Sequence, residues 1–470
     1  MVTERNGNAP APQELQTFLS PEEKQKEKVV STYNMSDTKD PESADFDPFT
    51  ERKLDNPTSD MDTLTHLLKA SLGTGILAMP KAFKNVGLVL GIFYTILVAV
   101  VCTHCAYILI KCSHVLYKKK RKTQMSFPEV GEAALEYGPQ ALRSYANGFR
   151  IFILISLFAT YFGTSSVYTV IVAKNIAQVA AYYMDIPEEK VDTRLFILAL
   201  LLPLIFLAWI RNLKYLAPAS MIANCFMGLG LGITLYYLLG TGELKTDQIN
   251  DMLFKHPFEW PEFFSLTIFA IEAIGVIMPL ENAMKTPRSM LGICGVLNKG
   301  TSGVTVVYII IGFLGYLRFG ETVKDSITLD LDITQIPAQI VKISIAIAVY
   351  CTYGLQFYVC IEIMWKSIKD KFTKRPVLAD YIMRTIMVTS TVLLAIAVPQ
   401  IAPFMGVLGA FCFSVLGLIA PAFIEVITYW HIGFGPTKYI IWKNVIVVIF
   451  GLFALVFGTK AAITQIILGN

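Results

Sequence analysis

Two ionisable side chains lie in or beside long apolar stretches of this chain, where an unpaired charge is costly. Glu272 is embedded in the sequence FAIEAIGVIM, and His66 directly precedes LLKASLGTGILAMP. Acids inside membrane spans usually face the interior of a helix bundle and commonly mark proton or ion paths. Histidine changes charge between pH 5 and 8, so it could load a proton from an acidic side. We predict proton coupling for both; the alternatives are a carboxylate bonded to backbone and a structural histidine.

Glycines interrupt the same two apolar stretches. Gly73-Thr74-Gly75 is followed by Pro80, and Ile274-Gly275 is followed by Pro279. A glycine costs about 1 kcal/mol of helix propensity relative to alanine. Backbone freed inside a membrane is tolerated only where protein buries it or where it lines a cavity. The alternative is that these glycines only allow close helix packing. Because two segments share the pattern, we predict two discontinuous helices that flank a binding site at mid-depth.

Two such breaks of opposite direction would provide partners for both charges of an amino acid zwitterion. Free amides at the start of a half-helix suit a carboxylate, and unwound carbonyls suit an ammonium group. We therefore predict that the amides of Gly73, Thr74 and Gly75 bind the carboxylate. The carbonyls of Ala70, Ser71 and the segment Phe269–Ile271 are predicted to bind the ammonium group. Phe269, Ala273 and Gly275 are predicted to shape the side-chain pocket, and Tyr353 and Gln356 to reach the site from further along the chain. For Tyr353, aromatic packing is the alternative.

The elements that position these residues must be membrane helices. Of the 470 residues, 54% are apolar and only 16% are charged, whereas soluble domains average about 25% charged residues. Eleven apolar blocks are near or above the roughly 20 residues of a spanning helix. These blocks cover residues 64–84, 86–110, 150–181, 194–210, 213–240, 263–284, 301–317, 336–364, 381–398, 402–429 and 441–465. The mixed segment 126–145 is predicted to be a surface helix.

The two interrupted blocks are the first and the sixth, so they enter the membrane from opposite sides. We predict an all-α polytopic membrane protein with eleven transmembrane helices, a five-plus-five inverted repeat and discontinuous helices 1 and 6. The predicted parts are a disordered tail (1–60), repeat one (61–240), repeat two (241–430), and helix 11 with the C-terminus (431–470). The composition of the tail, rich in Pro, Glu, Lys and Ser, is typical of disorder.

Loop charges predict the orientation. With a cytosolic N-terminus, the inner loops carry 21 basic residues, Lys118–Lys122 among them, and three outer loops carry 13 acidic residues. Basic loops stay in the cytosol, so the C-terminus is predicted to be extracellular or lumenal. Lys118–Lys122 is interpreted as a topology determinant, with contact to lipid headgroups as the alternative.

Several functions are disfavoured by the residues present. Cys102-Thr-His-Cys105 lies in an apolar helix, where cysteine is commonly buried, and no cysteine lies in an outer loop, so we predict neither a metal site nor a disulfide. No nucleophile–base set or nucleotide-binding loop is recognisable, so an enzyme, a cofactor and a nucleic-acid partner are not predicted. The expected partners are the substrate, the coupling proton and the lipid bilayer.

Three motifs in order carry a family resemblance: HLLKASLGTGILAMPKAFKNVG, FAIEAIGVIMPLENAMKTP and TYGLQFYVCIE. They resemble the proton-assisted amino acid transporter family of the amino acid/auxin permease superfamily, and the likeness extends from residue 60 to the end. The resemblance implies the leucine-transporter fold and symport of protons with small neutral amino acids such as alanine, glycine or proline. It implies a place at the plasma membrane or the late endosome and lysosome, with a link to growth signalling.

The resemblance also bears on single residues. His66 matches the histidine that is tied to proton coupling in that family, and Glu272 falls in its sixth-helix motif. The resemblance implies a disulfide between outer loops in some mammalian members, but the predicted outer loops of this chain contain no cysteine. We therefore do not transfer the mammalian substrate range.

A function of a different class is also compatible with the sequence. In an amino acid sensor, substrate binding would change the contacts of the cytosolic tail with signalling partners, and transport would be slow or incidental. Flux distinguishes the two: a symporter turns over under a pH gradient, whereas a sensor binds saturably without flux.

Overall fold

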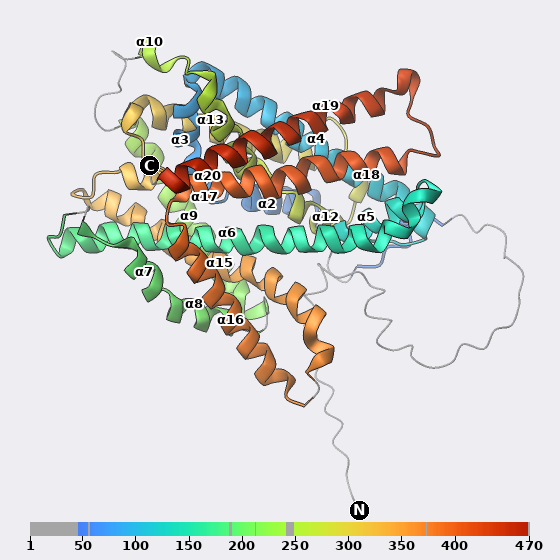
Figure 1. Ribbon diagram of the computed structural model, residues 1–470, viewed down its shortest axis with the longest axis horizontal. Helices are drawn as coiled ribbons and strands as arrows, with labels where there is room; N and C mark the ends of the chain where they lie inside the picture. Colours follow the sequence, from blue (N-terminus) through green and yellow to red (C-terminus); the bar gives the residue numbers. More distant parts are fainter. Residues whose placement is uncertain are drawn as a thin grey trace, which may run out of the picture.

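The computed structural model describes residues 46–54, 57–187, 190–211, 213–240, 249–372 and 374–468. The predicted tail up to residue 45 lies outside this part of the chain. The described part is helical nearly throughout, and its longest helix, α6, crosses the whole molecule (Figure 1).

The α-helices are α2 Asp60–Ser71, α3 Met79–Val86, α4 Leu88–Lys120, α5 Phe127–Glu136, α6 Ala146–Tyr183, α7 Thr193–Ala199, α8 Leu201–Ala208, α9 Leu213–Gly240, α10 Ile249–Met252, α11 Trp260–Ile271, α12 Ile274–Ala283, α13 Val296–Phe319, α14 Ile327–Asp330, α15 Ile336–Ile368, α16 Pro376–Ala397, α17 Ile401–Val407, α18 Ala420–Thr428, α19 Tyr439–Phe453 and α20 Thr459–Leu468.

Within the described residues, nine helical segments are long and apolar enough to cross a membrane. They are Leu88–Lys120, Gln140–Tyr183, Met221–Gly240, Pro257–Ala283, Val296–Thr322, Ile336–Ile368, Pro376–Ala397, Ile401–Thr428 and Pro436–Leu468. The prediction of an all-helical membrane protein is confirmed. The two other predicted spans are interrupted or short: 64–84 is divided among α2, a 3₁₀ segment and α3, and 194–210 forms the shorter apolar stretch Thr193–Ala208.

The first break separates α2 from α3. Ser59 and Asp62 form a capping box that starts α2, which satisfies amides that have no partner inside the helix. The helix ends at Ser71, and Leu72 and Gly73 leave the helical region, with Gly73 fully extended (φ −90°, ψ −159°). The 3₁₀ segment Thr74–Ala78 then leads directly into α3.

The second break lies at Glu272–Ala273, two residues earlier than the predicted Ile274–Gly275. Glu272 is extended (φ −70°, ψ 122°) and α12 starts at Ile274. Gly275 lies inside α12, so the prediction misjudged its role. A Cβ at Gly275 would come within 2.3 Å of the Tyr161 hydroxyl oxygen, so this glycine allows α6 to approach closely.

The halves of the two broken helices pack crosswise. The first half-helix, α2, contacts α12, and the second half-helix, α3, contacts α11; α13 packs against both α2 and α3. A π-helical stretch, Leu408–Ile419, packs on α11, and α6 packs on α15. Most buried apolar side chains form one core around α3, α11, α13 and α15. This packing brings both breaks to the same level of the bundle.

Two predicted surface segments have more contacts than the sequence suggested. The predicted surface helix at 126–145 contains α5, which buries most of its residues against α6 and α18 because its Val, Ala and Leu side chains are apolar. The predicted disordered tail extends to residue 60, whereas the structure shows contacts within it. Asp47 and Arg52 bond to Arg288 and Glu281, and Thr58 pairs with Met284 in an isolated β-bridge. The ion pair between Arg52 and the buried carboxylate of Glu281 holds this segment against the helix bundle.

Candidate functional site

A cavity of about 80 Å³ lies between the two breaks. Its walls come from the first helix around its break, from the break between α11 and α12, and from α6, α15 and the π-helical stretch Leu408–Ile419. Ten predicted site residues line it: Ala70, Ser71, Gly73, Thr74, Gly75, Phe269, Glu272, Ala273, Gly275 and Gln356. The structure therefore brings together most of the residues selected from the two interrupted stretches.

Three predicted site residues do not line this cavity. Ile271 is buried in the apolar core. Tyr353 stacks on Phe357 with ring centroids 5.2 Å apart, and its hydroxyl is 2.9 Å from the Thr391 hydroxyl. These contacts match the alternative given for Tyr353, which is aromatic packing. The third residue, His66, lies outside the cavity on α2.

Sequence reasoning missed the wall formed by α6. Leu157, Thr160, Tyr161, Thr164 and Tyr168 line the cavity from this helix. Leu157, Tyr161, Thr164 and Tyr168 recur at intervals of three or four residues, and Thr160 adjoins Tyr161, so these side chains share one helical face. A polar stripe on an otherwise apolar helix was a usable signal. The missed residues elsewhere are Ile274, Val276, Phe413 and Leu416, which are apolar and carry no comparable signal.

Three buried oxygen atoms that line the cavity have no hydrogen-bond partner among the residues that the structure describes. They are Ser71 Oγ, Thr74 Oγ1 and Glu272 Oε2. The Tyr168 hydroxyl lies near both Thr74 and Gln356, but no contact to Thr74 Oγ1 reaches good hydrogen-bond geometry. Buried polar atoms in folded proteins are almost always hydrogen-bonded. This cavity is therefore prepared for a polar ligand or a proton.

The Glu272 carboxylate has two different oxygens. Oε1 accepts a 2.9 Å hydrogen bond from the Ile274 amide at the start of α12. This bond matches the alternative given for Glu272, a carboxylate bonded to backbone. The Cys102 thiol, a weak donor, lies near this carboxyl group, but among the described residues no contact to Oε2 has good hydrogen-bond geometry, although Glu272 is only 8% exposed. A Cβ at Gly417 would lie 2.3 Å from Oε2, so this glycine leaves room for the carboxyl group. Keeping such a carboxylate ionised and unpaired costs several kcal/mol, so Oε2 favours a proton or a cationic group.

Tyr308 connects the two breaks. Its hydroxyl, from α13, donates to the Ser71 carbonyl at the end of α2 and to the Ala270 carbonyl near the end of α11, the second at 2.9 Å. A tyrosine hydroxyl has one hydrogen, so the two carbonyls share it. These carbonyls belong to the set predicted for the ammonium group, and each keeps a second lone pair for a ligand.

His66 lies on the helix face that leads to the cavity. His66 and Ala70 are four residues apart on α2 and share one face. Both are exposed, and Ala70 lines the cavity. The four residues correspond to about 6 Å along the axis. His66 is therefore placed at the approach to the cavity, and its coupling role stays a prediction.

A family model now decides what kind of protein contains this cavity. The model described as "Transmembrane amino acid transporter protein" matches residues 56–464. The chain belongs to this transporter family. The predicted family resemblance is thus confirmed, and so is the prediction that the chain is not an enzyme.

Individual relatives agree with the family. The transporter is 54% identical over 466 residues to the "Proton-coupled amino acid transporter-like protein pathetic" of Drosophila melanogaster, covering 98% of this chain and 96% of that protein. It is 29% identical over 322 residues to the "Vacuolar amino acid transporter 4" of Saccharomyces cerevisiae, covering 67% of this chain and 42% of that protein.

Solved structures with some likeness are more distant. Mhp1 in an inward-facing conformation has a TM-score of 0.47 and 13% identity, covering 88% of this chain and 92% of that chain. A Na⁺-coupled sialic acid symporter in an outward-open state has a TM-score of 0.39 and 12% identity, covering 86% and 96%.

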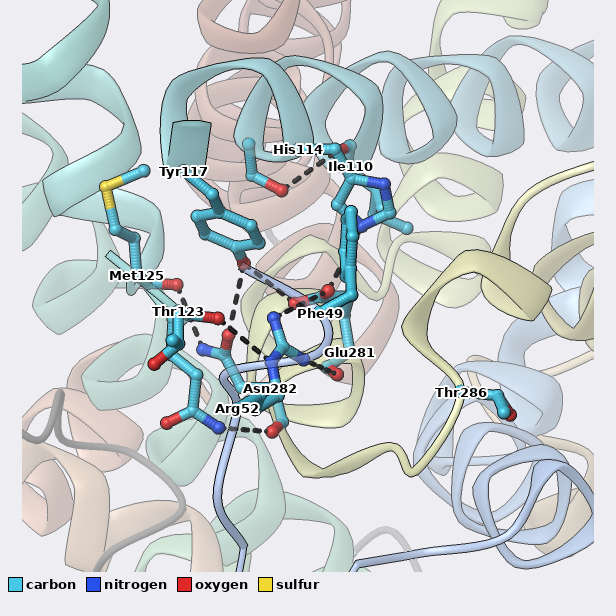
Figure 2. Close-up of polar contacts among 12 residues, drawn as sticks. Phe49, Arg52, Ile110, His114, Tyr117, Thr123, Met125, Glu281, Asn282 and Thr286 are labelled. Atoms are coloured by element: carbon cyan, nitrogen blue, oxygen red, sulfur yellow. Dashed lines mark hydrogen bonds and ion pairs between the residues drawn. The ribbon is translucent and has the colours of Figure 1, made fainter. Parts of the chain in front are cut away.

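The C-terminal end of α12 in the transporter is held in place by a cluster that sequence reasoning missed. We call Arg52, His114, Tyr117 and Glu281 the inner anchor (Figure 2). Glu281 Oε1 lies 3.2 Å from an Arg52 guanidinium nitrogen and 3.1 Å from His114 Nε2, and Glu281 Oε2 accepts a 2.7 Å bond from Tyr117. The Arg52 and Glu281 side chains are 3% and 0% exposed.

Backbone contacts extend the inner anchor. Arg52 donates to the carbonyls of Glu281 and Thr123 at 3.0 and 2.9 Å, and Phe49 packs edge-on against His114 with centroids 4.9 Å apart (Figure 2). One arginine thus ties three segments together: the residues before α2, the loop after α4 and the end of α12. An acid in the sixth apolar block was visible in the sequence, but its partner in the predicted tail was not.

Replacing Arg52 with alanine is expected to loosen the C-terminal end of α12. The change leaves a fully buried carboxylate without its arginine partner, and breaking such a pair costs roughly 3–5 kcal/mol when nothing compensates. We expect amide hydrogen exchange over residues 274–283 to become at least about tenfold faster. Lys53→Ala, at the exposed neighbouring position, serves as the control. Unchanged exchange in the Arg52→Ala protein would contradict the role of the inner anchor.

A second isolated carboxyl group lies in the loop between α13 and α15. Asp330 Oδ1 accepts a 2.9 Å bond from the Lys324 amide, whereas Oδ2 is buried and has no hydrogen-bond partner in the described part of the chain. Burial raises the pKa of Asp330 to about 7, against the opposing effect of the bond from Lys324 and of the nearby Lys324 and Lys342 charges. The group is therefore neutral in an acidic compartment and becomes charged above neutral pH.

Asp330 predicts that the transporter is more stable at acidic pH. A folded-state pKa above the unfolded value of 3.8 contributes stability that is complete below 3.8 and is lost as the pH rises through about 7. The thermal midpoint in detergent is expected to be higher at pH 5 than at pH 8. Asp330→Asn should reduce that difference by at least half, because asparagine stays neutral. An equal difference in the variant would assign the pH dependence to another group.

Proposed function

We propose that this transporter carries small neutral amino acids together with protons by alternating access. The observation that carries the proposal is the set of three unpartnered buried oxygens at one cavity between two broken helices. The Drosophila relative, at 54% identity, is named a proton-coupled amino acid transporter-like protein, which supports proton coupling here. The proposed membranes are the plasma membrane and the late endosome or lysosome, with a link to growth signalling.

The cavity is suited to a small zwitterion. The substrate carboxylate lies at the amides of Gly73, Thr74 and Gly75, which open the second part of the first helix. The ammonium group lies at the carbonyl ends of α2 and α11, where Tyr308 holds the backbone in place. A water-sized group needs roughly 10–15 Å³ of such space, so about 80 Å³ holds roughly five to eight of them. That corresponds to a substrate about as large as alanine.

The coupling proton binds at Glu272. Protonation of Oε2 removes an unpaired charge beside the cavity, so the proton and the substrate occupy the site together most favourably. His66 exchanges the proton at the approach to the cavity on α2. No other cofactor enters the proposal.

The proposed topology has eleven crossings, with a cytosolic N-terminus and an extracellular or lumenal C-terminus. It counts the broken first helix and the stretch Thr193–Ala208 together with the nine long spans. The crosswise packing of α2 with α12 and of α3 with α11 supports two inverted repeats of five helices.

Uptake into proteoliposomes tests the proposal. The purified chain is reconstituted, and uptake of a panel of amino acids is measured with the outside at pH 5.5 or 7.5 and the inside at pH 7.5. We expect alanine, glycine or proline to enter faster at pH 5.5 and to carry an inward current. Equal uptake at both pH values, or a preference for large or charged amino acids, would refute it.

The inner anchor favours a sensor as the second candidate. Arg52 connects the end of the N-terminal tail to α12, which lines the substrate cavity, so substrate binding could move the tail. Signalling partners would then bind the tail. Saturable amino acid binding without flux in the same proteoliposomes would select the sensor over the symporter.

A further inference from the structure

An apolar groove of about 830 Å³ lies between the end of α15 and the start of α16. Met364 and Ile368 of α15 form one wall, and Leu378, Ile382 and Ile386 of α16 form the other. In Figure 1 these two helices form a hairpin that projects from the rest of the bundle. The proposed topology places the closed end of this hairpin on the cytosolic side.

The depth of the groove matches one leaflet of a bilayer. Leu378, Ile382 and Ile386 recur every four residues, so they form a continuous stripe, and they are 50%, 50% and 61% exposed. The lining residues of α16 end at Met387, and the helix rises about 17 Å between Pro376 and that residue. Half of a hydrocarbon core of roughly 30 Å is about 15 Å. The stripe therefore extends from the membrane surface to its midplane.

Three cations surround the mouth of the groove. Lys371, Lys374 and Arg375 line it and are exposed, and within the described residues no carboxylate is paired with them. This arrangement of charge at the surface and apolar side chains below matches an amphiphile with a negative head.

The described acids near the mouth already have partners. Asp380 is 2.8 Å from Arg211 and 2.9 Å from Arg384, and it is buried on the opposite side of α16. Glu362 lies 3.7 Å from Lys366. These carboxylates do not neutralise the mouth.

We propose that this groove binds one anionic phospholipid of the cytosolic leaflet. Its phosphate-bearing headgroup lies on Lys371, Lys374 and Arg375, and an acyl chain follows the stripe on α16. Basic pockets between membrane helices on the cytosolic side are suited to acidic headgroups. A neutral lipid would leave the three cations without a partner, and a soluble phosphate would leave the apolar groove unfilled.

The lipid would contact a helix that also lines the substrate cavity. Gln356 and Met364 are eight residues apart on α15, which is about 12 Å along the axis. Occupancy of the groove therefore restrains one wall of the cavity. The motion of α15 beside the cavity would therefore depend on how much acidic lipid the membrane contains.

Native mass spectrometry of the full chain in mild detergent tests the site. The probes are dioleoyl phosphatidylserine and dioleoyl phosphatidylcholine, which share acyl chains and differ in charge. We expect one phosphatidylserine to bind more tightly than phosphatidylcholine. The triple variant Lys371→Gln, Lys374→Gln and Arg375→Gln is expected to lower phosphatidylserine affinity on the order of 100-fold, from about 1 kcal/mol for each cation.

Two further variants separate a site from general attraction. Ile382→Trp fills the groove without changing charge and is expected to lower affinity by at least about tenfold. Lys118→Gln, Lys119→Gln and Arg121→Gln together remove three cations at the end of α4, and the affinity should then change less than about threefold. Phosphatidylserine affinity is measured only for variants that purify as monodisperse protein. If the triple groove variant does not fold, the affinity of Ile382→Trp tests the groove by itself.

Three results would overturn the proposal. Equal losses from the two triple variants would indicate attraction to the whole charged surface. Equal affinity for the two phospholipids would remove the role of the cations. Displacement by glycerophosphoserine, which carries the headgroup without acyl chains, would indicate a site for soluble phosphates.

Discussion

Replacing Glu272 with glutamine is expected to abolish the dependence of uptake on a proton gradient. Glutamine keeps an oxygen for the Ile274 amide, which Glu272 Oε1 now accepts at 2.9 Å, and it keeps the shape beside Gly417. It cannot bind or release the proton that Oε2 would carry. Substrate-driven proton flux, measured with a pH-sensitive dye inside proteoliposomes, should fall at least about tenfold, while exchange of labelled for unlabelled amino acid persists.

A buried acid on the same helix provides the matched control. Glu262 also belongs to α11, is buried, and accepts a 2.5 Å bond from Gln465 away from the cavity. Glu262→Gln should keep proton-driven uptake. If Glu272→Gln retained its pH dependence, the proton would be carried elsewhere, with His66 the first residue to examine. If neutralising both Glu272 and His66 left the pH dependence intact, the assignment would be wrong.

Replacing Gly75 with alanine is expected to lower uptake at least about tenfold. A Cβ at this position would lie 2.5 Å from Ala270 Cα and 2.7 Å from Ala270 Cβ. Because the Cα belongs to the backbone, a rotamer change cannot relieve the contact, and α11 must move away from the first break. Overpacking of this kind costs about 1–3 kcal/mol. The displacement also separates the two half-helices whose ends are proposed to bind one substrate.

A glycine on a neighbouring helix distinguishes this effect from general sensitivity to added bulk. Gly303 on α13 would place a Cβ 3.6 Å from Leu68 Cδ2, an ordinary contact. Gly303→Ala should therefore transport normally. Equilibrium binding of labelled substrate to both variants in detergent separates loss of the site from loss of movement. Normal binding and uptake in Gly75→Ala would show that the close approach of α11 is not needed.

Patterns confined to one segment predicted much of the cavity. Glycine beside an apolar run and Met-Pro identified both interrupted helices, and Glu272 was conspicuous as an acid among apolar residues. The same reasoning misplaced the second break, because glycine serves two purposes that the sequence does not separate. At Gly275 it makes room for the Tyr161 hydroxyl, and the backbone opens at Glu272, whose own side chain caps the next half-helix.

Contacts between distant segments were beyond local patterns. Gln356 and Tyr353 are three residues apart on α15, yet only Gln356 lines the cavity, because the orientation of α15 depends on the helices packed around it. Arg52 lies in a stretch whose composition is typical of disorder. Its ordered position depends on Glu281, which is 229 residues away in the chain. A buried charge orders its partner only once the fold has brought the two together.

The shared hydrogen of Tyr308 has a consequence for leakage. If α2 tilts away from the bundle, the hydroxyl keeps its bond to Ala270, and if α11 tilts away, it keeps its bond to Ser71. Only when both depart at once does the hydroxyl exchange its protein partners for water, at a net cost of about 0.5–1.5 kcal/mol. The doubly open state is the one that would let protons and solutes run freely down their gradients. A single tyrosine thus makes this leak state roughly 2 to 13 times rarer than it would otherwise be, while each one-sided opening keeps the hydroxyl bonded.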